Sequence, residues 1–165
     1  MATSPSSYRR RSAGVNINIT QVEADALFAM EKFKISSRQY IWDNIRLEIP
    51  LASQDRGEQF LLDLRSARID FLKFKYQTRA RTAIILARLD FGQSERHINP
   101  DKVFIEGPHI HLYRENYADK WAYLLDDLPG GNVFSDLADY IKTLNEFMEY
   151  CNIKDAPSIT TGLFS

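Results

Sequence analysis

Apolar residues near the start of the chain recur with the period of a helix. Thr20 and Glu23 form the T-x-x-E pattern of a capping box, in which the two residues satisfy backbone N–H groups of the first turn. The apolar residues that follow stand three or four positions apart: Val22, Ala26, Leu27, Met30 and Phe33. We therefore predict a helix that begins after Thr20, ends near Ile35 or Ser36 and turns its apolar side to the core.

Beyond this helix the apolar period changes to two, which is typical of half-buried strands. Every second residue from Ile45 to Leu51 is apolar, and Pro50 between them suits the edge of a sheet. The same reading predicts five further strands, at 60–64, at 68–81, from Thr82 or Ala83 to Phe91, at 109–114 and at 120–125. A long polar loop, residues 92–108, separates the fourth strand from the fifth.

A second helical pattern follows a break at residues 126–131. Its apolar residues are Phe134, Leu137, Ile141, Leu144, Met148 and Cys151, which predicts a long C-terminal helix. The predicted fold class is α+β, with a single curved antiparallel sheet of about six strands and both helices packed on one face. The other face is left open for a ligand. We expect a flexible basic tail at residues 1–18, which contains the run Arg9–Arg11, and one α+β domain at residues 19–165.

Composition excludes several classes of protein. The chain has 165 residues, of which 44% are hydrophobic and 12% aromatic, so it can bury a core and is not disordered throughout. Its net charge of −1 argues against a globally basic nucleic-acid coat. The single cysteine, Cys151, forms no internal disulfide and fits a reducing compartment. No apolar run approaches the roughly 18 residues of a membrane helix, so we expect a cytoplasmic protein without a membrane partner.

The charges are unevenly distributed along the chain. Between Arg65 and Lys120, 11 basic residues stand against 7 acidic ones, and all three histidines lie there, which suits an anionic ligand. The alternation of the third predicted strand places a set of basic and polar residues on one face: Lys73, Lys75, Gln77, Arg79 and Arg81. We interpret this face as a phosphate-binding ridge for nucleic acid, with Tyr76 and Tyr113 stacking on bases or orienting the substrate. The alternative is a solvated outer face that keeps the sheet soluble.

A more specific set of candidate catalytic residues lies on the fifth predicted strand. If Ile110 and Leu112 face the core, His109, His111 and Tyr113 line the opposite face. Cleavage of RNA without a metal needs a base for the 2′-hydroxyl, an acid for the leaving oxygen and cations for the charge on phosphorus. Imidazoles serve both proton roles, and Arg or Lys supplies the charge. The catalytic candidates are therefore His109, His111, Arg114, Lys120 and His97.

The competing use of an H-x-H pair is metal binding. His97, His109 and His111 together would make a three-histidine zinc site with an open position. This requires the loop that carries His97 to fold back onto the strand, and the sequence places no carboxylate obviously to orient the rings. We therefore predict no metal cofactor and keep zinc as the lesser alternative.

Several motifs together resemble a known family. The segments Arg96-His97-Ile98-Asn99-Pro100-Asp101, Gly107-Pro108-His109-Ile110-His111-Leu112-Tyr113-Arg114-Glu115 and Asp119-Lys120-Trp121-Ala122 are similar to an H-x-N-P-D … P-H-x-H-x-Y-R-E … D-K-W-A signature. An uncharacterised family of small bacterial proteins carries this signature, and the resemblance spans nearly the whole chain after the tail. It implies a bacterial or mobile-element origin and no particular activity. Asn116 and Ala118 stand where that family is expected to have glycine, and Leu124 where it is expected to have proline.

The sequence leaves three functions open. A looser, fold-level similarity to toxin endoribonucleases of the RelE and barnase kind favours a metal-independent endoribonuclease of bacterial toxin type. A non-catalytic module would use the same face to bind RNA, another nucleic acid or an acidic protein. The third is a phage or mobile-element inhibitor of a host defence complex, with the acidic residues of the last helix in the contact: Asp136, Asp139, Glu146 and Glu149. An antitoxin or a defence protein is accordingly a possible partner.

Overall fold

The computed structural model describes residues 16–42, 46–66 and 73–161, and most of its elements are short strands. The two α-helices are α1 (Gln21–Ala29) and α2 (Tyr140–Tyr150), and a short 3₁₀ helix is η1 (Leu125–Asp127). The strands are β1 (Lys32–Lys34), β2 (Gln39–Trp42), β3 (Arg46–Ala52), β4 (Gln59–Ser66), β5 (Lys73–Ala80), β6 (Ile84–Gly92), β7 (Arg96–Ile98), β8 (Phe104–Glu106), β9 (His109–Leu112), β10 (Ala122–Leu124), β11 (Ile153–Asp155) and β12 (Ser158–Thr161). None of these helices is long and apolar enough to cross a membrane.

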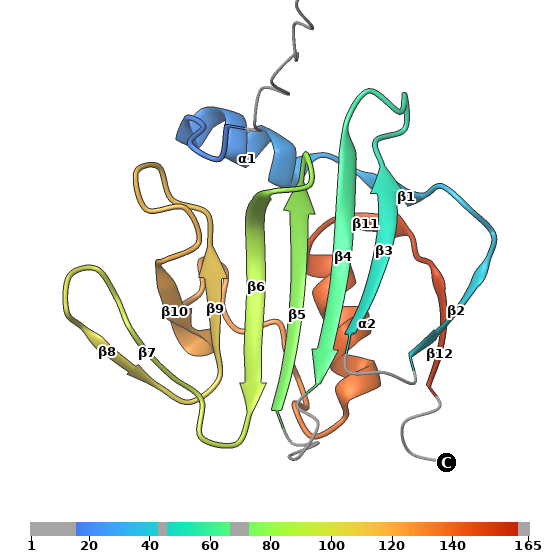
Figure 1. Cartoon of the computed structure of the whole chain (residues 1–165). Coiled ribbons are helices and arrows are strands. Elements are labelled where there is room, and N and C mark those ends of the chain that lie inside the picture. Colours follow the sequence, from blue (N-terminus) through green and yellow to red (C-terminus); the bar gives the residue numbers. More distant parts are fainter. Residues whose placement is uncertain (1–15, 43–45, 67–72, 162–165) are drawn as a thin grey trace, which may run out of the picture.

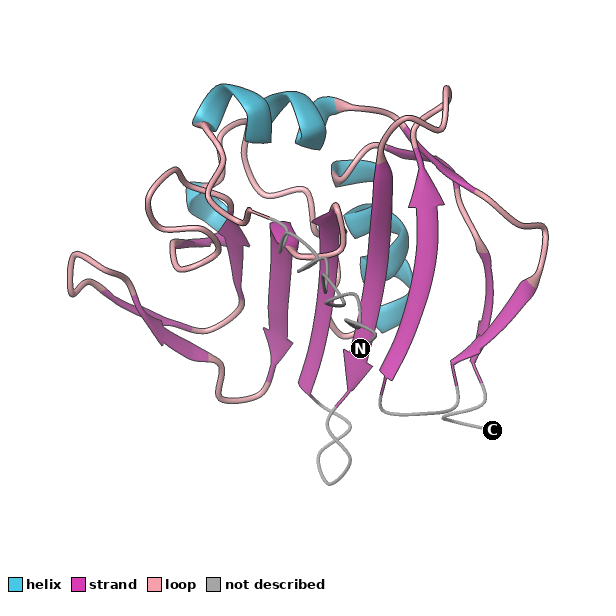
Figure 2. Cartoon of the chain, turned by 45° about the horizontal axis from the view of Figure 1, so that its top comes forward, coloured by secondary structure: helices cyan, strands magenta, loops and turns pink. Residues whose placement is uncertain are grey.

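Within the described residues, eight strands form one sheet in the order β10–β9–β6–β5–β4–β3–β1–β11. Neighbouring strands are antiparallel except for β1 and β11, which are parallel, so the sheet is mixed. Figure 1 shows α2 behind the middle of this sheet and α1 across one end of the strands. The view in Figure 2, turned by 45°, keeps the two helices in these places.

The predicted fold was wrong in its sheet and in its helices. The six predicted strands correspond to β3, β4, β5, β6, β9 and β10, but the sheet also contains β1 and β11 and is not purely antiparallel. These two strands have three residues each, too few to show a period of two. The C-terminal helix has only 11 residues and begins at Tyr140, because Asp139 caps it by accepting a hydrogen bond from the backbone N–H of Lys142.

The first helix begins where the sequence predicts and ends earlier. Thr20 accepts a hydrogen bond from the backbone N–H of Glu23, as the capping box requires. The helix ends at Ala29, because the chain is extended at Met30 and leads directly into β1. Most of the predicted tail, including Arg9–Arg11, lies outside the described residues, as do residues 68–72 of the third predicted strand.

The alternation predicted for the third strand is confirmed in β5. Phe74, Tyr76, Thr78 and Ala80 are buried, and the residues between them are half-buried. The buried side chains contact aromatic rings on several other elements: Trp42, Phe91, Tyr140 and Phe147. The aromatic core therefore lies between the sheet and α2.

The register of the sheet arranges polar residues in two rows on the face away from this core. One row crosses β3, β4, β5, β6 and β9 through Glu48, Asp63, Gln77, Arg88 and His111. The second row crosses the same strands through Arg46, Arg65, Lys75, Asp90 and His109. Acidic and basic side chains from different strands therefore become neighbours on this face.

The predicted loop at residues 92–108 contains the β7–β8 hairpin. The carboxamide of Asn99, which follows β7, accepts a hydrogen bond from the backbone N–H of Ala122 at 2.8 Å. It donates one to the carbonyl of the same residue at 2.9 Å. Because Ala122 belongs to β10, the hairpin is fixed to the edge of the large sheet.

Candidate functional site

Pairing between β6 and β9 brings together the groups of the candidate site. The register places Asp90 opposite His109 and Arg88 opposite His111. All four side chains lie on the face away from the aromatic core, because residues two apart on a strand share a face. Asp90, His109 and His111 are buried, and each histidine is only 1% exposed.

Both imidazoles are held in one orientation by the backbone. His109 donates from Nδ1 to the carbonyl of Gly107 at 2.8 Å, and His111 donates from Nδ1 to the carbonyl of Asp119 at 2.8 Å. In each ring the proton on Nδ1 leaves Nε2 as the reactive nitrogen. The two Nε2 atoms face the same oxygen of Asp90, at 3.6 Å from His109 and 3.4 Å from His111.

Arg88 completes the contacts of this pair. Its Nη2 donates to Nε2 of His111 at 2.9 Å, which requires that nitrogen to be unprotonated. Its Nε lies 3.3 Å from Oδ1 of Asp90, and its Nη1 donates to Asp119 at 2.5 Å. Nε of Arg88 and Oδ1 of Asp90 nevertheless make no well-aligned hydrogen bond to any described residue. Such buried polar atoms are uncommon, and two others among the described residues, Nε1 of Trp42 and Oγ1 of Thr78, lie in the core.

The surroundings shift the pKa values of the two histidines in opposite directions. Burial lowers the pKa of His111, the charge of Arg88 lowers it further, and together they outweigh the contact with Asp90. Burial also acts to lower the pKa of His109, but Asp90 and the Gly107 carbonyl outweigh it and raise this pKa above 6.5. Burial acts to raise the pKa of Asp90, yet the two imidazoles, Arg88 and Lys75 hold it well below its usual range.

The third histidine joins this group from the hairpin. The ring of His97 lies 4.6 Å from that of His111 and 5.9 Å from that of His109, measured between centroids. His97 Nε2 is hydrogen-bonded to the backbone carbonyl of Lys120 at 2.8 Å. The structure therefore brings His97 to the face of His109 and His111. We call these three residues, together with Asp90 and Arg88, the histidine cluster.

The donor atoms of Asp90, His109 and His111 lie within 4.8 Å of one another, a spacing that could hold a divalent metal ion. Histidines that bind metals commonly donate their second nitrogen to a backbone carbonyl, as these two do. Arg88, however, occupies the lone pair of His111, and its charge opposes a second cation beside Asp90. The zinc site that the sequence suggested consists of His97, His109 and His111. The group found in the structure has Asp90 in place of His97.

The predicted basic ridge is largely paired with carboxylates. Arg79 donates from Nε and Nη2 to the two oxygens of buried Asp63, at 2.6 and 2.8 Å. Arg81 lies just past the end of β5 and pairs with Glu23 and Glu58 at 2.6 and 2.7 Å. The remaining cations of the ridge are Lys73 and Lys75, and Nζ of Lys75 lies 3.8 Å from Asp90.

The side chains of four further predicted site residues form no part of the histidine cluster. Tyr76 is fully buried, and its hydroxyl donates to the carbonyl of Tyr140 at 2.7 Å. Tyr113 is buried as well, and its hydroxyl bonds both the N–H and the carbonyl of Ile19. Arg114 stacks on the indole ring of Trp121, with its guanidinium carbon 3.8 Å from the ring centroid. Lys120 is exposed and contributes its backbone carbonyl to His97.

Residues 19–153 match the model of a family described as a family of unknown function (DUF6978). The chain belongs to this family. No match was found among curated proteins or among solved structures. The part of the chain that matches DUF6978 contains all five residues of the histidine cluster, so the site lies within the shared domain.

Sequence reasoning missed Arg88, Asp90 and Asp119. Arg88 and Asp90 interrupt an otherwise apolar predicted strand at positions two apart, which is the signal that could have found them. Their partners on β9 follow only from the pairing of two strands separated by the hairpin. Asp119 lies in the turn between β9 and β10 and contributes both its backbone carbonyl and its carboxylate.

Proposed function

We propose that this protein is a metal-independent endoribonuclease of bacterial toxin type, with His111 as the general base and His109 as the general acid. The observation that carries the proposal is that the Nε2 atoms of two neighbouring imidazoles face one oxygen of Asp90, while Arg88 contacts the Nε2 of His111. These surroundings lower the pKa of His111 and raise that of His109. At neutral pH such a pair holds one ring ready to accept a proton and the other ready to donate one. Their fixed Nδ1 protons support the same assignment, because each ring then exchanges protons through Nε2.

In the proposed reaction, the ribose 2′-hydroxyl takes the place of Arg88 at Nε2 of His111. His111 accepts the proton, the 2′-oxygen attacks phosphorus, and the bond from phosphorus to the 5′-oxygen breaks. His109 gives its Nε2 proton to that leaving oxygen, and the products are a 2′,3′-cyclic phosphate and a 5′-hydroxyl. The displaced guanidinium of Arg88 then stabilises the negative charge on the phosphoryl oxygens.

The substrate approaches through the part of the cluster that reaches solvent. The side chains of Arg88 and Asp119 are 18% and 27% exposed, whereas both imidazoles are almost completely covered. The phosphate therefore meets Arg88 first and competes with Asp119 for its guanidinium. Lys75, which is 43% exposed on the neighbouring strand, supplies a second cation on this side.

The test is the incubation of the purified protein with labelled RNA in excess EDTA. The informative variants are His111→Asn and His109→Asn, because the carboxamide of Asn can keep the hydrogen bond to the backbone carbonyl while removing Nε2. We expect the wild type to cleave and both variants to lose about 100-fold or more in rate. The control is Arg96→Gln, which removes an exposed charge on β7 outside the cluster.

Each result has one meaning. Cleavage at unchanged rate in either Asn variant removes the assignment of that histidine. Intact RNA both with EDTA and with added divalent metals overturns the nuclease. Cleavage that requires an added metal favours a metal centre at Asp90, His109 and His111 instead. Urea denaturation of each variant separates lost chemistry from lost folding.

A further inference from the structure

A cavity lies beneath α1, between that helix and the ends of β9 and β10. Its volume is about 320 Å³, which is within the range of sites for small ligands. The residues that line it include Gln21, Asp25, Leu86, Leu112, Arg114 and Tyr123. Leu112 alternates along β9 with the neighbouring His111 and points to the opposite face of the sheet. The cavity is therefore separate from the histidine cluster.

One side of the cavity presents Arg114, an exposed cation that has no carboxylate partner among the described residues. Stacking on Trp121 fixes the plane of the Arg114 guanidinium, and Tyr117 lies beside it with its ring centroid 5.8 Å away. Among the described residues no carboxylate or carbonyl accepts a hydrogen bond from this guanidinium, and none bonds the hydroxyl of Tyr123. A stacked guanidinium leaves its in-plane N–H groups free to bind a carboxylate through two parallel hydrogen bonds.

The other side of the cavity presents an oriented carboxylate. Gln21 Nε2 donates to Oδ1 of Asp25 at 2.8 Å and to the carbonyl of Tyr113 at 3.3 Å. The Gln21 side-chain oxygen accepts from the backbone N–H of Glu115 at 2.9 Å, so the carboxamide is held at both ends. Oδ2 of Asp25 has no hydrogen bond to a described residue and can accept one from a ligand.

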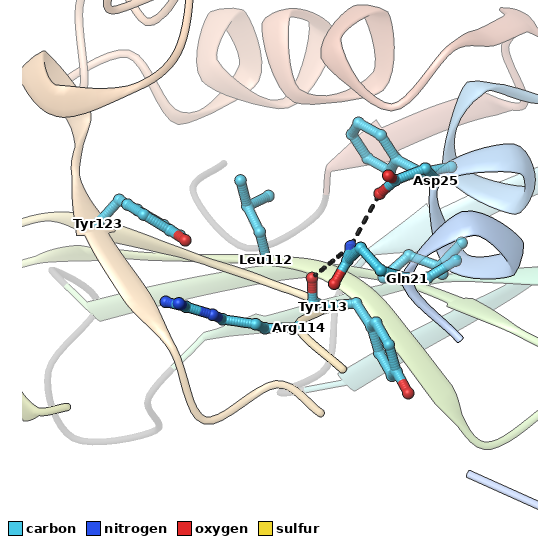
Figure 3. Close-up of a pocket in the computed structure, with 9 residues that line it drawn as sticks. Gln21, Asp25, Leu112, Tyr113, Arg114 and Tyr123 are labelled. Carbon is cyan, nitrogen blue, oxygen red and sulfur yellow. Dashed lines mark hydrogen bonds between the residues drawn. The ribbon is translucent and has the colours of Figure 1, made fainter. Parts of the chain in front are cut away.

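Apolar surface separates these two ends. Figure 3 shows Arg114 and Tyr123 on one side of the pocket, Gln21 and Asp25 on the other, and Leu112 between them. Leu112 is only partly buried although it lies within the sheet, and Leu86 lies beside it in the lining. Leu86 is already almost completely buried, so a ligand gains the free energy of removing apolar surface from water by covering Leu112.

We propose that this cavity binds a short zwitterionic apolar peptide, of which a dipeptide is the minimal form. The peptide carboxylate pairs with Arg114 and Tyr123, its ammonium group with Asp25, and its apolar side chains cover Leu112. Asp25 repels a ligand that has only anionic groups, so a cationic end is part of the specificity. The site does not depend on the nuclease, because it uses other residues on the opposite face of the sheet.

The test is isothermal titration calorimetry with the dipeptide Leu-Leu and, as its matched ligand, N-acetyl-Leu-Leu-amide, which lacks both charges. We expect Leu-Leu to bind and the blocked peptide to bind about tenfold more weakly or not at all. Arg114→Gln and Asp25→Asn should each weaken Leu-Leu about tenfold. Arg96→Gln, which removes an exposed charge from β7 outside the cavity, is the control for net charge.

Thermal denaturation of the ligand-free variants checks that each one folds. The proposal is overturned if no heat is measured with millimolar Leu-Leu and folded wild-type protein. It is also overturned if both peptides bind equally, or if Arg96→Gln weakens binding as much as Arg114→Gln. Tyr123→Phe, which removes only a hydroxyl, provides a variant that keeps the shape of the cavity.

Discussion

His109 and His111 extend from the same face of β9 with their ring centroids 5.0 Å apart, and each ring donates its Nδ1 proton to a backbone carbonyl. A single carboxylate, Asp90, faces both Nε2 atoms. The two rings are nevertheless not equivalent, because only His111 also contacts the guanidinium of Arg88. This asymmetry shifts the pKa of His111 down and that of His109 up.

We expect NMR titration of the ring protons to show His111 with a pKa below 6.5 and His109 with a pKa above it. Asp90→Asn removes the negative charge and should lower the pKa of His109. Arg88→Gln removes the positive charge and should raise the pKa of His111. Arg96→Gln should leave both values unchanged. Two rings that titrate together near 6.5 would contradict the proposed acid and base.

Arg79→Ala tests whether the basic ridge is structural. This change leaves the carboxylate of Asp63 buried without its main partner, so we expect the free energy of unfolding to fall by about 3–5 kcal/mol. The matched control is Arg65→Ala on the same face, where the arginine is exposed, with an expected change within about 0.5 kcal/mol. Equal losses in the two variants would show that the Arg79–Asp63 pair contributes nothing beyond a surface charge.

Lys32 links the ends of both helices from a fully buried position. Its Nζ donates to the carbonyls of Phe28, Met30 and Cys151 at 2.9, 2.9 and 2.8 Å. Lys32→Met keeps the length of the side chain and leaves three carbonyls without a donor. We expect it to lower the free energy of unfolding by about 2–4 kcal/mol at neutral pH, measured by urea denaturation. Leu61→Met, on a half-buried position of β4, is the control for a change to methionine.

The same lysine predicts a dependence of stability on pH. Burial lowers the pKa of Lys32 to about 8 from its ordinary value of 10.5, although Cys151 acts in the opposite direction. Between these values the unfolded chain holds a proton that the folded protein has released, so the Lys32 contribution to stability rises with pH. Wild-type stability should therefore rise relative to Lys32→Met from about pH 8 to 10.5. A constant difference over this range would contradict the lowered pKa.

Ala118→Gly should stabilise the turn between β9 and β10. Asn116 and Ala118 have φ angles of 70° and 50°, so both adopt the left-handed conformation that glycine would take at these positions. For alanine this conformation is costly, and we expect the glycine variant to gain about 0.5–1 kcal/mol in thermal or chemical denaturation. Ala26→Gly in α1 is the matched control and should lose about 1 kcal/mol. A loss in both variants would show that Ala118 carries no strain.

Local sequence patterns correctly predicted the structural features that depend on a single helix or strand. The capping box of Thr20 and Glu23 located the start of α1. The period of two in β5 placed Tyr76 and Lys75 on opposite faces of the sheet. The ends of the helices were wrong, because they depend on Asp139 as a cap and on the pairing of β1 with β11. Phe134 and Leu137 continue the apolar spacing of α2 although they precede it in the chain. They do so because the segment that carries them packs against the same core as α2.

By itself, the sequence determined which residues alternate on strands such as β5 and β9, and with them the position of His109 and His111 on one face. It also indicated an uncharacterised family, which the match of residues 19–153 to DUF6978 confirms. Only the tertiary structure decided that Arg79 is neutralised by Asp63, that Asp90 lies between the histidines and that His97 folds back to them. The physical reason is that the period of a strand is a local property of the backbone. Which charge lies opposite which is set by strand order and register, and these depend on burial across the whole sheet.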